Sequence, residues 1–160
     1  MSHSDLKSKL EFKQLINNLP NCQYKVGSRD VNASWDCSII SGNTSGEKAY
    51  MIVEIKDKKE ASTKWPNGFV EKHKYDGLEK IRKEMKEDKG IDCSIVFVTF
   101  YRTDNMMYLW VIDDIAETHE IKMMYLPTTT EETYFEAGWK YGPTYWLPRT
   151  NANLIIDLNK

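Results

Sequence analysis

The sequence predicts an α/β fold of the α+β kind, in which helices flank a central mixed sheet. Residues 50–56 and 93–101 are nearly unbroken apolar segments of strand length, which is typical of strands buried on both faces. Residues 5–19 and 68–89 repeat apolar side chains at helical spacing. The chain has 160 residues, enough for one domain with a sizeable core.

The first third of the chain predicts one helix and three strands. The helix over 5–19 follows Ser4, a good N-cap residue, and Pro20 ends it. The apolar stripe of this helix is predicted to consist of Leu6, Leu10, Leu15 and Leu19, with Phe12 and Ile16 beside them. Strands are predicted at 22–28, 35–40 and 48–56, and the turn-forming residues 41–46 join the last two as a hairpin.

The middle third predicts a second helix and two further strands. Asn67 is the predicted cap of a helix over 68–89, and Gly90 ends this helix. Strands are expected over 93–101 and 106–112, before a polar connection that includes a short helix.

Residues 113–160 form an aromatic-rich extension of the predicted core. The segments 125–128 and 146–149 resemble one another, as if two strand ends were built alike. Trp139, Tyr141 and Tyr145 form an aromatic cluster between them, which either packs on the core sheet or offers a platform for stacking bases.

The charge of the chain is nearly balanced, with a formal net charge of −2, so no global basic field indicates nucleic acid. Between residues 56 and 90, eleven Lys and Arg stand against eight Asp and Glu, a net of +3, so the rest of the chain carries −5. This asymmetry fits a local surface that faces phosphate, and it also fits an ordinary solvated helix.

Cysteine and histidine usage excludes several kinds of site. The three cysteines Cys22, Cys37 and Cys93 are widely spaced, and no pair has zinc-ligand spacing, so small buried thiols in a reducing cytoplasm are expected. The three histidines are also scattered, which argues against a histidine metal site or a catalytic triad. No apolar run is long enough to cross a membrane, and the polar N-terminal residues carry no secretory signal.

The clearest chemical signal is a pair of charges at the end of the strand over 48–56. Glu54 and Lys56 lie two residues apart and so share one face, where buried charge is costly unless it is paired or bound to metal. If the hairpin turn is centred near Ser45, cross-strand partners have numbers that sum to 90, and Asp36 lies opposite Glu54. Two opposed carboxylates repel, so they need a shared proton or a cation between them.

A simpler interpretation of these residues stays open. Glu54 and Lys56 would then be a surface ion pair at a strand end, and Asp36 a solvated residue. The same spacing recurs elsewhere, as in Glu120 and Lys122, but that pair lacks a second carboxylate placed to meet it.

The order of elements and the positions of Asp36 and Glu54-Ile55-Lys56 resemble the PD-(D/E)XK nuclease superfamily of restriction-endonuclease-like proteins. The resemblance covers about residues 5–112 and implies an αβββαβ core, with 113–160 as a C-terminal elaboration of a single domain over 1–160.

The resemblance implies a Mg²⁺-dependent nuclease that hydrolyses phosphodiester bonds, with Mn²⁺ as an alternative ion. Asp36, Glu54 and the backbone carbonyl of Ile55 would hold the metal through hard oxygen ligands. Lys56 would orient the attacking water or help to deprotonate it. Glu11, on the first helix, would complete the outer shell or bind a second ion.

A second match lies on the helix after the lysine strand. Glu71-Lys72-His73-Lys74-Tyr75 occupies the place of a Gln-x-x-x-Tyr motif found in exonuclease-like branches, and it is similar to a helix in small nuclease-related proteins of phages and mobile elements. Lys72 and Lys74 would face phosphate, and Tyr75 would position Lys56 or a carboxylate.

These resemblances imply nucleic acid as the partner, with DNA favoured over RNA, no membrane association and a cytoplasmic location, which is the host cytoplasm if a phage encodes the chain. A homodimer stays open. Two other classes remain: a catalytically silent nucleic-acid-binding domain, and a protein-interaction module such as an inhibitor of host defence. The intact Asp, Glu and Lys favour the enzyme, while the mild negative charge is compatible with the interaction module.

Overall fold

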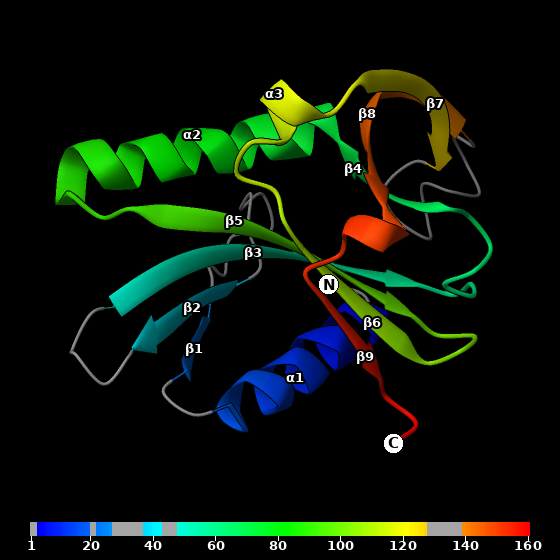
Figure 1. Ribbon diagram of the computed structural model, residues 1–160, viewed down its shortest axis with the longest axis horizontal. Coiled ribbons are helices and arrows are strands. Elements are labelled where there is room, and N and C mark those ends of the chain that lie inside the picture. Colours follow the sequence, from blue (N-terminus) through cyan, green and yellow to red (C-terminus); the bar gives the residue numbers. More distant parts are fainter. Residues whose placement is uncertain (1–2, 20–21, 27–36, 43–47, 128–138) are drawn as a thin grey trace.

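The structure is a computed structural model that describes residues 3–19, 22–26, 37–42, 48–127 and 139–160 (Figure 1). Its helices and strands, in chain order, are α1 (His3–Asn17), β1 (Cys22–Val26), β2 (Cys37–Gly42), β3 (Lys48–Lys58), β4 (Asn67–Glu71), α2 (Lys72–Lys89), β5 (Cys93–Tyr101), β6 (Met106–Val111), α3 (Ile115–Thr118), β7 (Ile121–Pro127), β8 (Trp139–Pro148), the short 3₁₀ helix η1 (Arg149–Asn151) and β9 (Leu154–Asp157).

Two sheets are present in the described part of the chain. Six strands form the main sheet in the order β1-β2-β3-β5-β6-β9, and three form a small sheet in the order β4-β8-β7. Strand β3 pairs with β5 in parallel, while the other pairs in the main sheet are antiparallel, so this sheet is mixed. The predicted fold class, a mixed central sheet flanked by helices, is confirmed.

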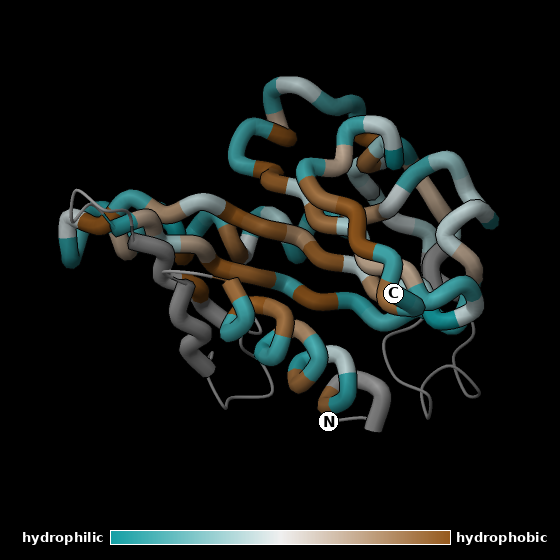
Figure 2. Tube along the Cα trace, turned by 60° about the horizontal axis from the view of Figure 1, so that its bottom comes forward, coloured by the Kyte–Doolittle hydropathy of each residue, from teal (hydrophilic) through white to brown (hydrophobic). Residues whose placement is uncertain are grey.

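Side-chain alternation along β3 divides the core into two layers. Val53 and Ile55 point to the face that α1 covers, where they join the buried Phe12. Ile52 points to the other face, where it belongs to a cluster with Leu78 of α2. Figure 1 shows α1 and α2 on opposite sides of the main sheet, with the small sheet on the side of α2. The most hydrophobic stretches of the chain lie along the central strands (Figure 2).

The predicted hairpin register is confirmed for the described residues. Cys37 pairs with Val53, and the ladder continues in step to Gly42 and Lys48. Each pair of partners has numbers that sum to 90, as the centred turn predicts. Strand β5 also has the predicted bounds, Cys93–Tyr101.

The predicted start of the second helix is wrong, because residues 67–71 form strand β4 and α2 begins at Lys72. Asn67 therefore pairs with Pro148 in a sheet and does not cap the helix. Gly68 and Val70 point inward, and a Cβ at Gly68 would lie 2.8 Å from the ring of Trp110, so the strand packs closely here. Gly90 ends α2 with a left-handed φ of 65°, as predicted.

The apolar stripe of α1 also differs from the prediction. Leu6, Leu10 and Leu19 are each about half exposed, at 49%, 52% and 47%. Phe12 and Ile16 are buried, and with Ser8 they repeat at four-residue spacing along the face that meets the sheet. The helix is thus rotated so that Ser8, Phe12 and Ile16, and not these leucines, lie on the buried face.

The C-terminal third confirms the similar strand ends and adds a strand that the sequence did not predict. Strands β7 and β8 pair with each other and end at Pro127 and Pro148. Strand β9 then pairs with β6 at the edge of the main sheet. In the aromatic cluster Tyr145 is buried in the core, Tyr141 is 57% exposed, and the side chain of Trp139 is outside the described residues. No described helix is both long and apolar enough to cross a membrane.

Candidate active site

Glu54 is a buried carboxylate near the end of a central strand. It belongs to β3, at the register position opposite Phe97 of β5, and only 4% of the residue is exposed. Its even-numbered position directs the side chain to the face of the main sheet that α2 covers, as for Ile52. A carboxylate in such a place is stable in its charged form only with positive partners close by.

Two lysines supply that positive charge. Lys56 Nζ, from the same strand, lies 3.4 Å from Glu54 Oε1. Lys74 Nζ, from the first turn of α2, lies 3.4 Å from the same oxygen. The side chains of these lysines are 39% and 30% exposed, so each ammonium group reaches water as well as the carboxylate. The structure therefore brings together Glu54 and Lys56 of the strand motif and Lys74 of the helix motif.

A further pair of lysines extends this positive surface, and the sequence analysis did not single it out. Lys58 and Lys64 both contact Glu60, at 3.8 Å and 3.2 Å. Burial lowers the pKa of Lys58, and the neighbouring charges of Lys56 and Lys64 lower it further, against the opposing effect of Glu60. A sequence signal for Lys58 existed, since residues 54, 56 and 58 share one face of a strand.

The other predicted residues of the helix motif have separate partners. The Tyr75 hydroxyl lies 3.1 Å from the backbone carbonyl of Asp113 and 3.4 Å from Glu79 Oε2. In the described contacts the carboxylate beside Tyr75 is therefore that of Glu79, and Tyr75 contacts neither Lys56 nor Glu54. Burial raises its pKa to about 12. Lys72 Nζ lies 2.5 Å from Asp76 on the solvent side of the helix, and this hydrogen bond raises the pKa of Lys72. Glu71 ends β4 and contacts His73 at 3.3 Å.

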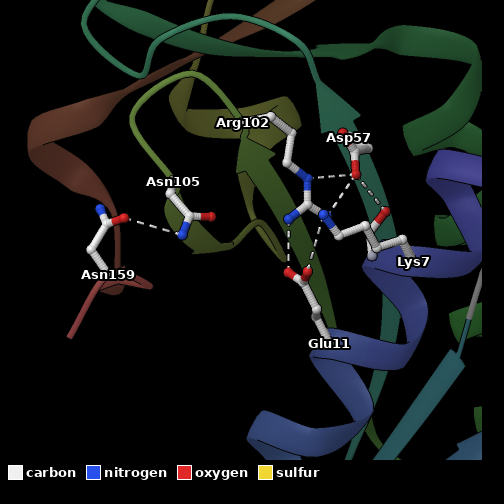
Figure 3. A network of polar contacts seen from close by, with 7 residues as sticks. Lys7, Glu11, Asp57, Arg102, Asn105 and Asn159 are labelled. Carbon is white, nitrogen blue, oxygen red and sulfur yellow. Dashed lines mark hydrogen bonds and ion pairs between the residues drawn. The ribbon is translucent and has the colours of Figure 1, made fainter.

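Glu11 lies in a different ion cluster, on the α1 face of the main sheet. The guanidinium of Arg102 donates to Glu11 Oε2 at 2.7 Å and to Asp57 Oδ2 at 2.8 Å (Figure 3). Ser8 also donates to Asp57 Oδ2, at 3.0 Å. Because Glu54 and Asp57 are three residues apart in β3, their side chains point to opposite faces. The structure thus brings Glu11 to Arg102 and Asp57 instead of to Glu54, and a metal role for Glu11 stays a prediction.

The Arg102 cluster anchors α1 to the sheet. Burial alone would lower the pKa of Arg102, but its hydrogen bonds to Asp57 and Glu11 raise it above the ordinary value. The Asp57 side chain is only 4% exposed, so it depends on Arg102 for its counter-charge. Arg102 also lies 4.7 Å from the centre of the Phe100 ring.

The donor chemistry at Glu54 fits a hard cation only in part. Mg²⁺ prefers oxygen ligands, and Glu54 offers a carboxylate next to the backbone carbonyl of Ile55. Among the residues that the structure describes, no three His, Cys, Asp or Glu side chains are grouped so as to hold a metal. The second carboxylate of the predicted site, Asp36, lies outside the described residues. The role of Asp36 as a metal ligand stays a prediction.

The chain matches no family model and no curated protein. Among solved structures, it is similar to Hjc, a Holliday junction resolvase from the archaeal hyperthermophile Archaeoglobus fulgidus. The two sequences are 12% identical, the alignment covers 94% of each chain, and the TM-score is 0.41.

Proposed function

We propose that the protein is a metal-dependent nuclease that hydrolyses phosphodiester bonds, with DNA favoured over RNA as its substrate. The observation that carries the proposal is the environment of Glu54: a carboxylate buried near the end of β3, with Lys56 and Lys74 each 3.4 Å from one of its oxygens. These three residues belong to the two motifs that resemble the PD-(D/E)XK superfamily, and the elements α1, β1, β2, β3, α2 and β5 follow the order of that family, with β4 added between β3 and α2.

The proposed metal ligands are Asp36, Glu54 and the carbonyl oxygen of Ile55, with Mg²⁺ as the ion and Mn²⁺ as an alternative. The β2–β3 register supports this set, because the described pairs have numbers that sum to 90, which is the register on which the sequence prediction for Asp36 and Glu54 is based. When bound, such an ion would polarise the phosphate and lower the pKa of a bound water.

The lysines have complementary roles in the proposal. Lys56 orients the attacking water and offsets the negative charge that develops on the phosphate, because its ammonium group is compact and partly solvent-exposed beside Glu54. Lys74 binds a non-bridging phosphate oxygen from the side of α2. In the metal-free protein the two ammonium groups lie 3.4 Å from Glu54 Oε1, where they offset the negative charge of a carboxylate.

A second candidate follows from the same contacts. Because two lysines already neutralise Glu54, the cluster also fits a structural ion group in a catalytically silent nucleic-acid-binding domain or a protein-interaction module. Only the nuclease requires a divalent cation at this place.

Calorimetric titration with Mn²⁺ distinguishes these candidates. The nuclease proposal predicts a heat of binding that disappears in Glu54→Gln and persists in Glu60→Gln, a control that removes a carboxylate paired with Lys58 and Lys64 instead. Cleavage of labelled single-stranded, duplex and branched DNA, with RNA counterparts, then defines the substrate. A wild-type protein that binds nucleic acid without binding Mn²⁺ or cleaving would be a silent domain.

A further inference from the structure

Lysine and aromatic side chains form a row that begins beside Glu54 and crosses the small sheet. Lys58 Nζ lies 5.3 Å from the centre of the Phe69 ring on β4. Phe69 meets Trp146 of β8 edge-to-face, with ring centres 5.7 Å apart. Lys122 Nζ of β7 lies 4.1 Å from the Trp146 ring centre. We call Lys56, Lys58, Phe69, Trp146 and Lys122 the lysine–aromatic row.

The row lies on one face of the small sheet. Phe69 and Trp146 are direct partners in the β4–β8 ladder. Lys122 is opposite Thr144, two residues before Trp146, so its side chain shares that face. Tyr141 is five residues before Trp146 in β8, so its ring belongs to the opposite face. Figure 1 shows the small sheet on the same side of the main sheet as α2, which carries Lys74 of the candidate active site.

The surface along the row has an excess of positive charge. Among the described residues, Glu54 is shared by Lys56 and Lys74, and Glu60 by Lys58 and Lys64. Glu71 lies on the same face of the small sheet as Phe69 and Lys122. With Lys122 included, five ammonium groups stand against three carboxylates along this surface. Lys122 has an aromatic neighbour but no carboxylate partner in the described part of the chain. An uncompensated positive surface favours an anionic ligand, and a row of this kind favours a polyanion.

The aromatic rings indicate which polyanion fits. A duplex presents phosphates but keeps its bases stacked, so it gains from the lysines alone. An unpaired strand presents both phosphates and base faces, and bases stack on aromatic side chains without regard to sequence. Phe69 and Trp146 are only partly buried, so their rings are accessible beside the lysines.

We propose that the lysine–aromatic row binds an unpaired segment of DNA next to the active site, with phosphates on Lys58 and Lys122 and bases against Phe69 and Trp146. In the free protein Lys122 covers the Trp146 ring, a weak contact at an exposed site. On binding, a base replaces the ammonium on the ring and Lys122 contacts a phosphate. The choice of DNA rests on the proposed function, while the binding step itself requires neither metal nor cleavage.

Fluorescence anisotropy in EDTA tests the row without cleavage. The probes are a labelled oligothymidine of about 15 nucleotides, an abasic strand of the same length and charge, and a duplex of that length. Wild-type protein is expected to bind oligothymidine about tenfold more tightly than the abasic strand. Trp146→Leu should remove this preference, and Lys122→Gln should weaken binding and reduce the salt slope by about 0.7.

Two control variants match these substitutions. Tyr141→Ser removes an exposed ring from the opposite face of the small sheet, and Lys80→Gln removes an exposed lysine from α2, whose side chain is 78% exposed. Both should bind oligothymidine as the wild type does. Circular dichroism checks that Trp146→Leu is folded. If Trp146→Leu is not folded, the affinity and salt slope of Lys122→Gln still test the proposal, because Lys122 is exposed and its substitution disturbs no buried contact.

Equal affinity for oligothymidine and the abasic strand, tighter binding of the duplex, or an unchanged salt slope in Lys122→Gln would overturn the proposal. Its failure is distinguishable from that of the nuclease. Binding as predicted without cleavage in Mn²⁺ would refute the nuclease and keep the row. Cleavage with unaltered binding in Trp146→Leu and Lys122→Gln would refute the row alone.

Discussion

At the scale of a single residue, the question is whether Lys56 is a catalytic lysine or only the partner of Glu54 in an ion pair. Its ammonium lies 3.4 Å from Glu54 Oε1, and its side chain is 39% exposed. If Lys56 served only as an ion-pair partner whose ammonium reaches water, the pair would stabilise the protein by about 0–1 kcal/mol, and arginine would serve nearly as well. A lysine that orients the attacking water has to be compact and within hydrogen-bond reach, which the planar guanidinium of arginine does not reproduce.

We therefore predict that Lys56→Arg and Lys56→Ala both lose most cleavage activity. Mn²⁺ affinity should change little, and the free energy of unfolding should stay within about 1 kcal/mol of the wild type. The measurement is metal-dependent cleavage of a labelled substrate, beside calorimetry and urea unfolding, with Lys64→Arg as the control. An arginine variant that cleaves at the wild-type rate would leave Lys56 as a phosphate contact only.

Whether Glu54→Gln raises or lowers the free energy of unfolding depends on the charged groups around Glu54. From the sequence alone, removing one of two opposed carboxylates is expected to relieve repulsion and leave the metal-free protein at least as stable. In the structure, two ammonium groups contact Glu54, so Glu54→Gln leaves them without this counter-charge. Both lysines reach water, which limits the loss to about 1 kcal/mol.

Urea unfolding in EDTA measures this difference, with Glu60→Gln for comparison. Glu54→Gln should have a lower midpoint than the wild type, with an unchanged slope. A higher midpoint would mean that repulsion between carboxylates outweighs the two lysines.

The limits of sequence reasoning at this scale follow from distance along the chain. The Glu54–Lys56 pair was predictable, because a strand fixes residues two apart on one face. Glu11 was not, because its partner Arg102 is 91 residues away and no local pattern connects them. Lys74 was predicted as a site residue only from its motif. Its contact with Glu54 depends on how α2 packs against β3, which is a tertiary contact that no local pattern reports.

At the scale of the elements, turn chemistry made the β2–β3 hairpin predictable. Its turn residues fix the register, and the described pairs follow it. Strand β4 was missed because Gly68, Phe69 and Val70 fit both a strand and the first turn of a helix. The long-range pairing of β4 with β8 decides between these alternatives, and a local pattern does not contain it.

Gly68 tests how closely β4 packs. A Cβ at this position would lie 2.8 Å from the Trp110 ring, which is 2% exposed and has little room to move. We predict that Gly68→Ala lowers the free energy of unfolding by about 1–3 kcal/mol through overpacking. Gly142→Ala, in the same sheet, is the matched control, because nothing lies within 4 Å of its Cβ position.

Urea unfolding of both variants measures the effect, and Gly142→Ala should stay within about 0.5 kcal/mol of the wild type. Equal midpoints for the two variants would show that Trp110 shifts freely and that β4 packs loosely.

At the scale of the whole molecule, two buried tyrosines should limit stability in alkali. Burial raises the pKa of both Tyr75 and Tyr101 to about 12, above the ordinary value of 10.0. The folded state thus holds these protons more tightly than the unfolded chain does. Their contribution to stability is complete below pH 10 and is lost as the pH rises through about 12.

Tyr75→Phe isolates one of these contributions. At pH 9 the free energy of unfolding of the variant should be about 1 kcal/mol lower than that of the wild type, because the variant lacks the hydrogen bond to Asp113. Between pH 10 and 12 the free energy of unfolding should fall in both proteins, and the fall should be smaller in the variant. The difference between the two falls should be at most about 3 kcal/mol. Urea unfolding across this range, with Tyr141→Phe as an exposed control, measures the difference. Parallel curves for all three proteins would contradict the burial argument.

The architecture places the proposed chemistry on one side of the main sheet. Glu54, Lys56 and Lys74 face α2 and the small sheet, while Glu11, Asp57 and Arg102 join α1 to the other side. The fold class was predictable because hydrophobic periodicity reports which segments are buried. The small sheet was not predictable from the sequence. Its central strand, over 139–148, pairs with the strands over 67–71 and 121–127, and no local pattern connects segments so far apart in the sequence.

The most direct test of the proposed active site is the rate of DNA cleavage in Mn²⁺ for the wild type, Glu54→Gln and Glu60→Gln. The two variants remove one carboxylate each, from neighbouring lysine pairs on the same side of the protein. We predict metal-dependent cleavage by the wild type and by Glu60→Gln, and a loss of at least about 100-fold in Glu54→Gln. Cleavage by Glu54→Gln at the wild-type rate, or no cleavage by the wild type on any substrate, would contradict the account.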